Sequence, residues 1–278
     1  MKVAVTGSKG QLGTEVTAEL KRRGFEIAEI DLPQVDITNE AEVRDCFLKA
    51  SPDAVIHLAA YTAVDRAEEE KDFCYAVNVT GTEHIARICG ELDIPVLFTS
   101  TDYVFDGSGT DFFETGSRIA PCNYYGQTKA LAEDVIKKYC KKFFIVRISW
   151  VFGPHGKNFV FTMLNLAKTK DEISVVCDQK GSPTYAPDVA VLIADMIVSE
   201  KYGTYHATNE GVCSWAEFAR EIMKLSGSNA IIKDIPSAVY PTAAVRPLNS
   251  RLSKASLDKA GFERLPDWKN ALERFFRN

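Results

Sequence analysis

The feature that most limits the fold of this chain is the alternation of short apolar runs with helical stretches over its first 150 residues. We predict strands at 2–5, 25–30, 54–58, 96–98 and 143–148, and helices at 12–22, 39–49, 73–92 and 124–140. Strands that alternate with helices of this length form crossover units and a parallel sheet covered on both faces. The sequence therefore predicts an α/β protein with a doubly wound, Rossmann-like parallel sheet.

The second half of the chain has a different rhythm. Loops rich in Gly, Pro and Asn occupy 152–158 and 181–184, and Ser214 and Glu217 are spaced as a capping box that opens a helix. We predict a smaller, partly discontinuous α/β lobe that lies over the carboxyl edge of the sheet, where doubly wound folds bind ligands. The predicted boundaries are 1–150 for the Rossmann domain, to which the chain returns around 175–205, and 151–278 for the substrate lobe.

Charge and cysteine content narrow the setting of the protein. The 278 residues carry 33 Lys plus Arg against 38 Asp plus Glu, so nothing favours a polyanion such as nucleic acid as a partner. No apolar run is long enough for a membrane span, and the first residues lack the apolar core of a signal peptide. The seven cysteines are dispersed without a C-x-x-C pair. We interpret them as reduced thiols in a cytoplasmic protein and predict no metal site.

A glycine motif follows the first predicted strand directly. Gly7, Gly10 and Gly13 give the pattern G-x-x-G-x-x-G at the start of the first helix. Glycines permit a tight turn and let the backbone approach a pyrophosphate at the positive end of a helix. The motif indicates a dinucleotide site, although a plain strand-to-helix turn is the alternative.

An acidic residue closes the second predicted strand, roughly twenty residues beyond the glycines. Asp31 stands where a carboxylate accepts hydrogen bonds from a ribose diol. An acid there disfavours a 2′-phosphate and no Arg stands beside it, so NADH is chemically plausible while NADPH stays open. The alternative for Asp31 is a turn residue before Pro33. Asp36 and Ile37 either flank the adenine or cap the next helix.

Tyr125 and Lys129 form the most informative pair of the sequence. Of the ten tyrosines only Tyr125 has a lysine four residues later, a spacing that puts both side chains on one helix face. We expect the ammonium to lower the pKa of the phenol, so that it can protonate a carbonyl oxygen during reduction. Thr101, in the polar cluster 99–105 after the fourth strand, would hold that oxygen. The alternative is that these hydroxyls bond the backbone at the strand end.

Together these motifs resemble the extended short-chain dehydrogenase/reductase superfamily, with Asn78-Val-Thr-Gly81 as a further element. Five segments are more specific and are similar to the dTDP-4-dehydrorhamnose reductase family. They are Ala59-Ala-Tyr-Thr-Ala-Val-Asp-Arg-Ala67, Ser100-Thr-Asp-Tyr-Val-Phe-Asp-Gly107, Ser149-Trp-Val-Phe-Gly153, Gln179-Lys-Gly-Ser-Pro-Thr184 and Arg246-Pro-Leu-Asn-Ser-Arg251. The resemblance covers nearly the whole chain.

The resemblance implies an enzyme that uses NADPH or NADH to reduce the C4 ketone of dTDP-4-dehydro-L-rhamnose, in the synthesis of a cell-surface polysaccharide precursor. Tyr125 would be the proton donor, Lys129 its partner and Thr101 the residue that orients the ketone. The implied coenzyme contacts are Gly7, Gly10, Gln11, Leu12, Gly13, Asp31, Asp36, Ile37, Ala60, Tyr61, Thr62, Asn78, Tyr125 and Lys129. The implied substrate contacts are Thr101, Asp102, Trp150 and, for the phosphates, Arg246 or Arg251. The alternative for Trp150 is a buried core residue after a strand. A homodimer, common among such relatives, stays open.

Two other functions are carried forward. One is a different nucleotide-sugar reductase or an epimerase of the same superfamily; a dehydratase is disfavoured because Tyr103 stands where a second acid would follow Asp102. The other is a non-catalytic, NAD(P)-binding subunit resembling the regulatory subunit of methionine adenosyltransferase, since a fold alone does not fix a function. His155, in a glycine-rich loop, and the acidic run 65–70 are interpreted as solvated.

Overall fold

The computed structural model describes residues 1–277. A parallel sheet of six strands in the order β10-β5-β4-β3-β1-β2 forms the larger lobe. Its strands are β1 (Lys2–Thr6), β2 (Glu26–Ile30), β3 (Ala54–His57), β4 (Val96–Thr101), β5 (Phe143–Ile148) and β10 (Gly203–His206). The strand order reverses between β1 and β3, which confirms the predicted doubly wound, Rossmann-like sheet.

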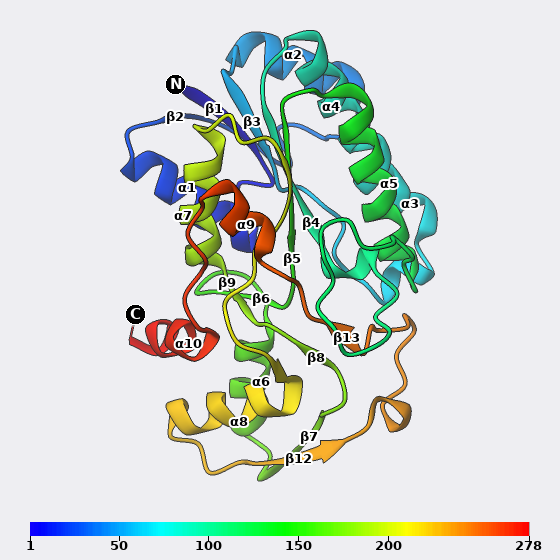
Figure 1. Cartoon of the computed structure of the whole chain (residues 1–278), viewed down its shortest axis with the longest axis vertical. Helices are drawn as coiled ribbons and strands as arrows, with labels where there is room; N and C mark the ends of the chain where they lie inside the picture. The colour runs from blue at the N-terminus through cyan, green and yellow to red at the C-terminus, as the bar shows by residue number, and fades with distance from the viewer. Residues whose placement is uncertain (278) are drawn as a thin grey trace.

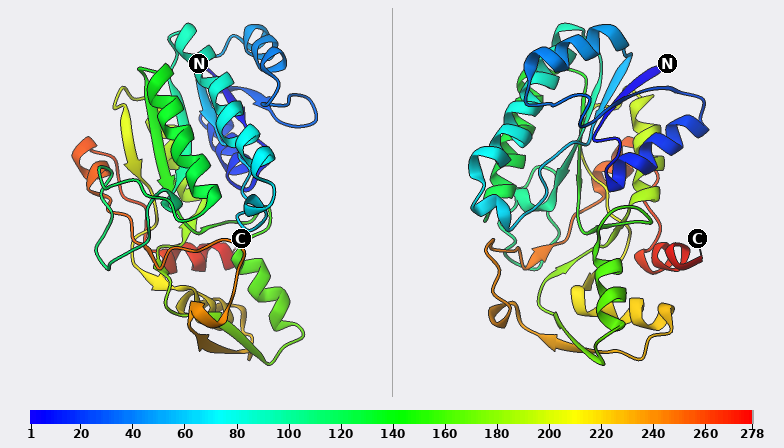
Figure 2. Two further views of the ribbon diagram at one scale, coloured as in Figure 1. Left: turned by 90° about the vertical axis from the view of Figure 1, so that its right-hand side faces the viewer. Right: turned by 180° about the vertical axis from the view of Figure 1, so that it is seen from behind.

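Helices cover both faces of this sheet (Figures 1 and 2). On one face lie α1 (Gln11–Arg22), α7 (Ala186–Ile197) and α9 (Ala255–Ala260), whose apolar side chains share one core with Val3, Val5 and Val146. On the other face lie α2 (Glu40–Ala50), α4 (Gly81–Glu91) and α5 (Tyr124–Tyr139). The inner strands β1, β3, β4 and β5 are thus buried from two sides, which explains the apolar residues that fill most of their length, whereas the edge strands β2 and β10 are only partly buried.

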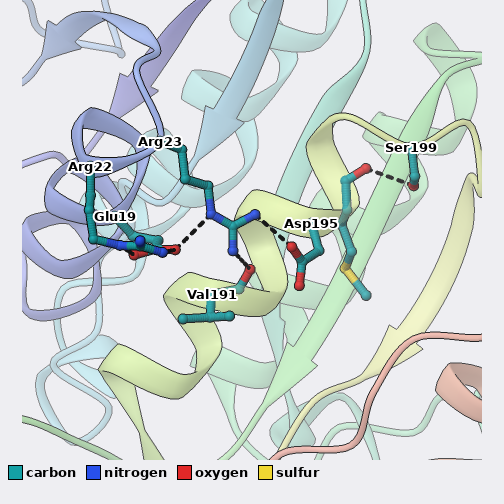
Figure 3. Close-up of polar contacts among 7 residues, drawn as sticks. Glu19, Arg22, Arg23, Val191, Asp195 and Ser199 are labelled. Carbon is teal, nitrogen blue, oxygen red and sulfur yellow. Dashed lines mark hydrogen bonds and ion pairs between the residues drawn. The ribbon is translucent and has the colours of Figure 1, made fainter.

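Packing between α1 and α7 connects the start of the chain to its second half. Arg23, which follows α1, donates to Asp195 Oδ1 at 2.5 Å and to the Val191 carbonyl at 3.3 Å on α7 (Figure 3). Glu19 accepts from the same guanidinium at 2.7 Å. Beneath these exposed contacts, Val16 and Leu20 pack into the apolar core. Because exposed ion pairs contribute little, burial of this apolar surface is the main link between the two helices.

Two predicted elements differ from the structure. Strand β4 continues to Thr101, so the hydroxyl cluster begins inside the strand. The predicted helix 73–92 is divided into α3 (Lys71–Tyr75), a π-helical turn η2 (Ala76–Thr80) and α4. The π-helical turn is only five residues long and is flanked by helical residues on both sides, so the sequence pattern does not reveal it. The turn carries Asn78, whose side chain supports a loop beside the site described below.

The smaller lobe lies beyond the carboxyl edge of the sheet (Figures 1 and 2). Its apolar core joins the helices α6, α8 and α10 to the parallel pair β7–β12 and includes the fully buried Phe152 and Phe218. Its remaining elements and the short helices of the chain complete the fold. They are β6 (Val151–Phe152), α6 (Phe159–Ala167), β7 (Glu172–Val176), β8 (Lys180–Gly181), β9 (Thr184–Tyr185), β11 (Cys213–Ser214), α8 (Trp215–Ser226), β12 (Ile231–Ile235), β13 (Asn249–Ser250), α10 (Trp268–Arg277), η1 (Arg66–Glu68), η3 (Asp102–Val104) and η4 (Ser237–Val239).

The predicted capping box at the start of α8 is confirmed: Ser214 Oγ accepts from the Glu217 amide, and the Glu217 carboxylate accepts from the Ser214 amide. Among residues 1–277, no helix combines the length and the apolar character that crossing a bilayer requires.

Candidate active site

A cleft of about 800 Å³ lies between the lobes at the carboxyl ends of β1, β3 and β4, the place where this topology binds ligands. It brings together most of the residues that the sequence singled out. The cleft is lined by Gly7, Gly10, Gln11, Leu12, Gly13, Asp31, Asp36, Ile37, Ala60, Thr62, Thr101, Asp102, Tyr125, Lys129, Trp150 and Arg246, among others.

The glycine loop is shaped by close backbone approach. Gly7 has φ +65°, and a Cβ there would lie 2.7 Å from the Ala59 nitrogen. A Cβ on Gly13 would lie only 2.0 Å from the Gly7 carbonyl oxygen, so the first turn of α1 rests directly on the loop. Gly10 is the N-cap of α1 and supplies no side-chain cap. The first amides of the helix thus face a cradle of backbone, which fits the pyrophosphate of a dinucleotide.

At the end of β2, Asp31 serves the loop itself. Its carboxylate accepts from the backbone amides of Lys9, at 2.9 Å, and Leu32, at 2.8 Å. The Lys9 ammonium donates to the carbonyl of the next residue, Leu32, at 2.9 Å and to Gln34 Oε1 at 3.0 Å. A cation is therefore present at the corner where the sequence showed only an acid, and this corner can accept a phosphate as well as a ribose diol.

The three predicted catalytic residues converge on the floor of the cleft. Thr101 ends β4, and Tyr125 stands in the first turn of α5, whose N-cap Asn123 accepts from the Gly126 amide at 2.8 Å. Gly126 is required there because a Cβ would lie 2.2 Å from the Tyr103 carbonyl oxygen. This close approach sets the Tyr125 ring edge-on against Tyr103, with centroids 5.8 Å apart.

The pKa of Tyr125 is raised, contrary to the sequence-based expectation. Burial is the main cause, and the negative charge of Asp102 adds to it, while the Thr101 hydroxyl acts in the opposite direction. Burial also raises the pKa of Asp102 to about 6. The phenol is thus held in its protonated form at neutral pH, as a proton donor must be.

Lys129 is almost completely buried one helical turn beyond the tyrosine. Its ammonium donates to the Thr99 carbonyl at 2.8 Å and lies 4.0 Å from the centroid of the Phe98 ring. Burial lowers its pKa to about 7, and Glu133 on the next turn opposes that change. These contacts explain why the expected acidification of Tyr125 is absent: the ammonium interacts with β4 and loses part of its charge through burial.

The opposite wall of the cleft comes from the smaller lobe. Trp150 follows β5 with φ +50°, a conformation that non-glycine residues rarely adopt. Its ring stacks on Trp215, the first residue of α8, with centroids 3.8 Å apart and planes at 14°. A Cβ on Gly181 would touch the Trp150 ring at 2.9 Å, so β8 packs closely behind it. Both indoles line the cleft and give this wall an aromatic, apolar character that suits a sugar or a base.

Three of the predicted residues lie outside the cleft. The Tyr61 hydroxyl donates to Glu70 at 2.5 Å. Asn78 bonds the backbone amide and carbonyl of Tyr61, at 2.8 and 3.2 Å, and therefore supports the loop 59–62 from behind. The Arg251 guanidinium donates to Asn249 Oδ1 at 2.8 Å, which leaves Arg246 as the arginine that lines the cleft.

The cleft also contains residues that the sequence did not predict as contacts of the coenzyme or the substrate: Lys9, Tyr103, Lys157 and Trp215. Trp215 stands directly after the capping serine, so the sequence predicts its place at a helix start but not its stacking on Trp150.

Within residues 1–277, no group of three or more His, Cys, Asp or Glu side chains is arranged to hold a metal ion. His155 is half exposed and lies 3.4 Å from the Glu15 carboxylate.

The doubly wound sheet, the glycine cradle and the Thr–Tyr–Lys set together define a dinucleotide-dependent oxidoreductase of the extended short-chain dehydrogenase/reductase type. Comparison with known proteins gives the narrower assignment: residues 1–278 match the model of the RmlD substrate binding domain family, and the chain belongs to this family.

Two curated relatives align along nearly the whole chain. The spore coat polysaccharide biosynthesis protein SpsK of Bacillus subtilis (strain 168) is 39% identical over 276 residues, which cover 99% of this chain and 97% of SpsK. The dTDP-4-dehydrorhamnose reductase of Aggregatibacter actinomycetemcomitans is 38% identical over 285 residues, which cover 98% and 97% of the two chains.

A solved structure shows the same fold. The crystal structure of dTDP-4-dehydrorhamnose reductase from Bacillus anthracis str. Ames, in complex with NADP, superimposes with a TM-score of 0.97 at 39% identity, and covers 99% of this chain and 98% of that chain. The sequence resemblance to the dTDP-4-dehydrorhamnose reductase family is thereby confirmed.

Proposed function

We propose that this protein reduces the C4 ketone of dTDP-4-dehydro-L-rhamnose to dTDP-L-rhamnose with NADPH or NADH. The observation that carries the proposal is the convergence of Thr101, Tyr125 and Lys129 on a cleft that also contains the glycine cradle. Relatives named as dTDP-4-dehydrorhamnose reductases match the full chain, and one of them is solved with NADP. When bound, the reduced nicotinamide supplies a hydride to the carbonyl carbon.

The residues of the chain handle the oxygen of that carbonyl. Addition of hydride leaves negative charge on the oxygen, which must be stabilised and then protonated. The Tyr125 phenol, whose pKa burial raises, is protonated at neutral pH and donates this proton. Thr101 lies beside it at the end of β4, where its hydroxyl donates to Asp102 Oδ1 at 3.0 Å. When the ketone binds, this donor turns to the carbonyl oxygen and orients it. Lys129 holds a ribose hydroxyl and, when charged, stabilises the phenolate that remains.

The nucleotide part of the substrate is assigned to the wall opposite the catalytic floor. The Arg246 guanidinium is only partly buried and lines the cleft, and its planar fork suits a diphosphate. Trp150, stacked on Trp215, covers the sugar. Asp102, buried and with a pKa raised to about 6, contacts the sugar hydroxyls.

The remaining proposals concern coenzyme, setting and assembly. Lys9 beside Asp31 supports use of NADPH in addition to NADH. The seven cysteines are all free, in keeping with a reducing cytoplasm. A homodimer is retained on the family resemblance, and sedimentation velocity would test it.

Turnover of the ketosugar, followed by the absorbance of the reduced coenzyme, tests the proposed function. Tyr125→Phe should lower kcat by about 10²–10⁴-fold, the usual contribution of a general acid. Tyr124→Phe is the matched control because its ring precedes Tyr125 on the same helix, and we expect it to retain wild-type activity. A Tyr125→Phe enzyme as active as this control would refute the assignment, and coenzyme binding without turnover of any dTDP-4-ketosugar would favour a regulatory subunit.

A further inference from the structure

Asp65 joins the two lobes at the mouth of the cleft. It lies in the turn that precedes η1 in the larger lobe, within the Ala59–Ala67 motif. The proposed reaction assigns no role to this acid. Its Oδ2 accepts from Arg246 Nη2 at 2.6 Å, and its Oδ1 accepts from the Ala244 amide at 3.2 Å. Both partners belong to residues 236–248, the β12–β13 connection, which runs from the smaller lobe toward the larger one (Figures 1 and 2).

The same connection reaches the catalytic helix. Arg246 Nη1 donates to the Tyr103 hydroxyl at 3.2 Å, and the Tyr103 ring packs edge-on against Tyr125. The side chain of Asn123, the N-cap of α5, donates to the Val245 carbonyl at 2.8 Å. Arg246 is therefore held between an acid on one side and a ring that contacts the proposed proton donor on the other.

The turn that carries Asp65 is itself fixed to α5. Glu68, in η1, accepts from the Tyr124 amide at 2.8 Å, at the first residue of that helix. A hydrogen bond thus connects the turn of Asp65 to the catalytic helix within the larger lobe, whereas Arg246 lies on a connection from the smaller lobe. Asp65 is thus the carboxylate of the larger lobe that forms an ion pair with the Arg246 guanidinium.

The strength of this ion pair also indicates its purpose. The Asp65 side chain is 44% exposed and that of Arg246 29% exposed, and ion pairs with such access to water contribute little to stability. An arginine on an irregular connection has many rotamers, and fixing one of them before a ligand arrives reduces the entropy lost on binding. The pair is therefore better explained by orientation of the guanidinium than by stabilisation of the fold.

We propose that Asp65 is a positioning residue for the nucleotide sugar: it holds the Arg246 guanidinium against Tyr103, so that the fork faces the diphosphate of a nucleoside-diphosphate sugar and the smaller lobe is in register with the catalytic tyrosine. This inference rests on the proposed function and extends it to a residue that touches neither the substrate nor the coenzyme.

The test measures binding of dTDP by calorimetry and steady-state kinetics with the ketosugar. Asp65→Ala should raise the Kd for dTDP and the KM for the ketosugar about tenfold, which corresponds to about 1.4 kcal/mol, while the Kd for NADPH stays within about twofold. Asp65→Asn, which keeps an acceptor for the Ala244 amide, should recover part of the affinity. Glu69→Gln is the matched control, since it removes an exposed acid from the same turn.

A double-mutant cycle separates positioning from a general structural effect. If Asp65 acts through Arg246, the double variant Asp65→Ala/Arg246→Ala binds dTDP no more weakly than Arg246→Ala alone. The inference would be overturned if the two substitutions raised the Kd for dTDP independently, so that the factors of the single variants multiply in the double variant. It would also be overturned if Asp65→Ala bound dTDP as tightly as Glu69→Gln. A wild-type protein that binds NADPH but no dTDP would overturn the proposed substrate class, so the two failures are distinguishable.

Discussion

Substitution of Gly13 by alanine tests the geometry of the coenzyme cradle. In an ordinary helix this change stabilises by about 1 kcal/mol, because alanine is the better helix former. Here the new methyl group would lie 2.0 Å from the Gly7 carbonyl oxygen and 2.8 Å from the Ser8 Cα. Both obstacles are backbone atoms, so no side-chain rotation relieves the contact, and α1 or the loop must move by about 1 Å.

The expected size follows from the two opposing effects. Overpacking of this kind costs roughly 1–3 kcal/mol. Taking about 3 kcal/mol, because the obstacle is backbone, and subtracting about 1 kcal/mol for helix propensity leaves a net loss of about 2 kcal/mol. For a chain of this length the melting temperature should fall by roughly 4–8 °C. Because the loop also forms the cradle, the Kd for NADPH should rise about tenfold.

The assay combines thermal unfolding, followed by circular dichroism, with NADPH titration. Gly116→Ala serves as control, since a Cβ there would meet no atom within 4 Å and the backbone needs no positive φ. The control should melt at or slightly above the wild-type temperature. If Gly13→Ala melts as high as the control and binds NADPH normally, the close contact between α1 and the loop is refuted.

Three further predictions concern charged groups. Lys9→Ala should raise the KM for NADPH about tenfold and leave the KM for NADH nearly unchanged, because the Lys9 ammonium is placed to meet a 2′-phosphate; equal changes with both coenzymes would contradict this. Burial lowers the pKa of His206 to about 3, so the unfolded chain takes up a proton there that the folded protein does not, and stability is lost as pH falls from about 6.5 toward 3. His206→Gln should therefore lower the slope of unfolding free energy against pH between 6 and 4 by about 1.4 kcal/mol per unit, measured by urea titration. Glu133→Gln leaves the buried Arg147 charge without its carboxylate. The free energy of unfolding, measured by urea titration at pH 7, should fall by about 3 kcal/mol, and a loss below about 1 kcal/mol would argue against a desolvated pair.

The sequence predicts the framework of the larger lobe well because local pattern and burial agree there. Strand β5 has the predicted bounds, 143–148, since it is buried on both faces and every residue but Arg147 is apolar. The capping box of α8 is equally local, because Ser214 and Glu217 need only three residues of helix to meet. Most of the predicted site residues line the cleft, since the strand ends that carry many of them meet at one edge of a parallel sheet.

What the sequence misses depends on contacts between distant segments. The spacing of Tyr125 and Lys129 places them on one helix but does not show that the ammonium reaches the Thr99 carbonyl, 30 residues away. Nor does it show that Asp102 approaches the phenol and helps to raise its pKa. The position of Lys9 beside Leu32 likewise depends on the folded loop. Electrostatics at the site therefore follows from tertiary structure, whereas residue identity follows from the motif.

The return of α7 and β10 to the larger lobe has a consequence for the order of events during synthesis on the ribosome. Strand β10 pairs with β5, and α7 supplies much of the core against Val3, Val5 and Val146. A nascent chain that has emerged only to residue 150 therefore leaves β5 as an open edge beside an uncovered apolar face, which invites association with other chains. The sheet of this half becomes complete only after about three quarters of the polypeptide has left the exit tunnel, and α9, which packs on the same core, emerges later still.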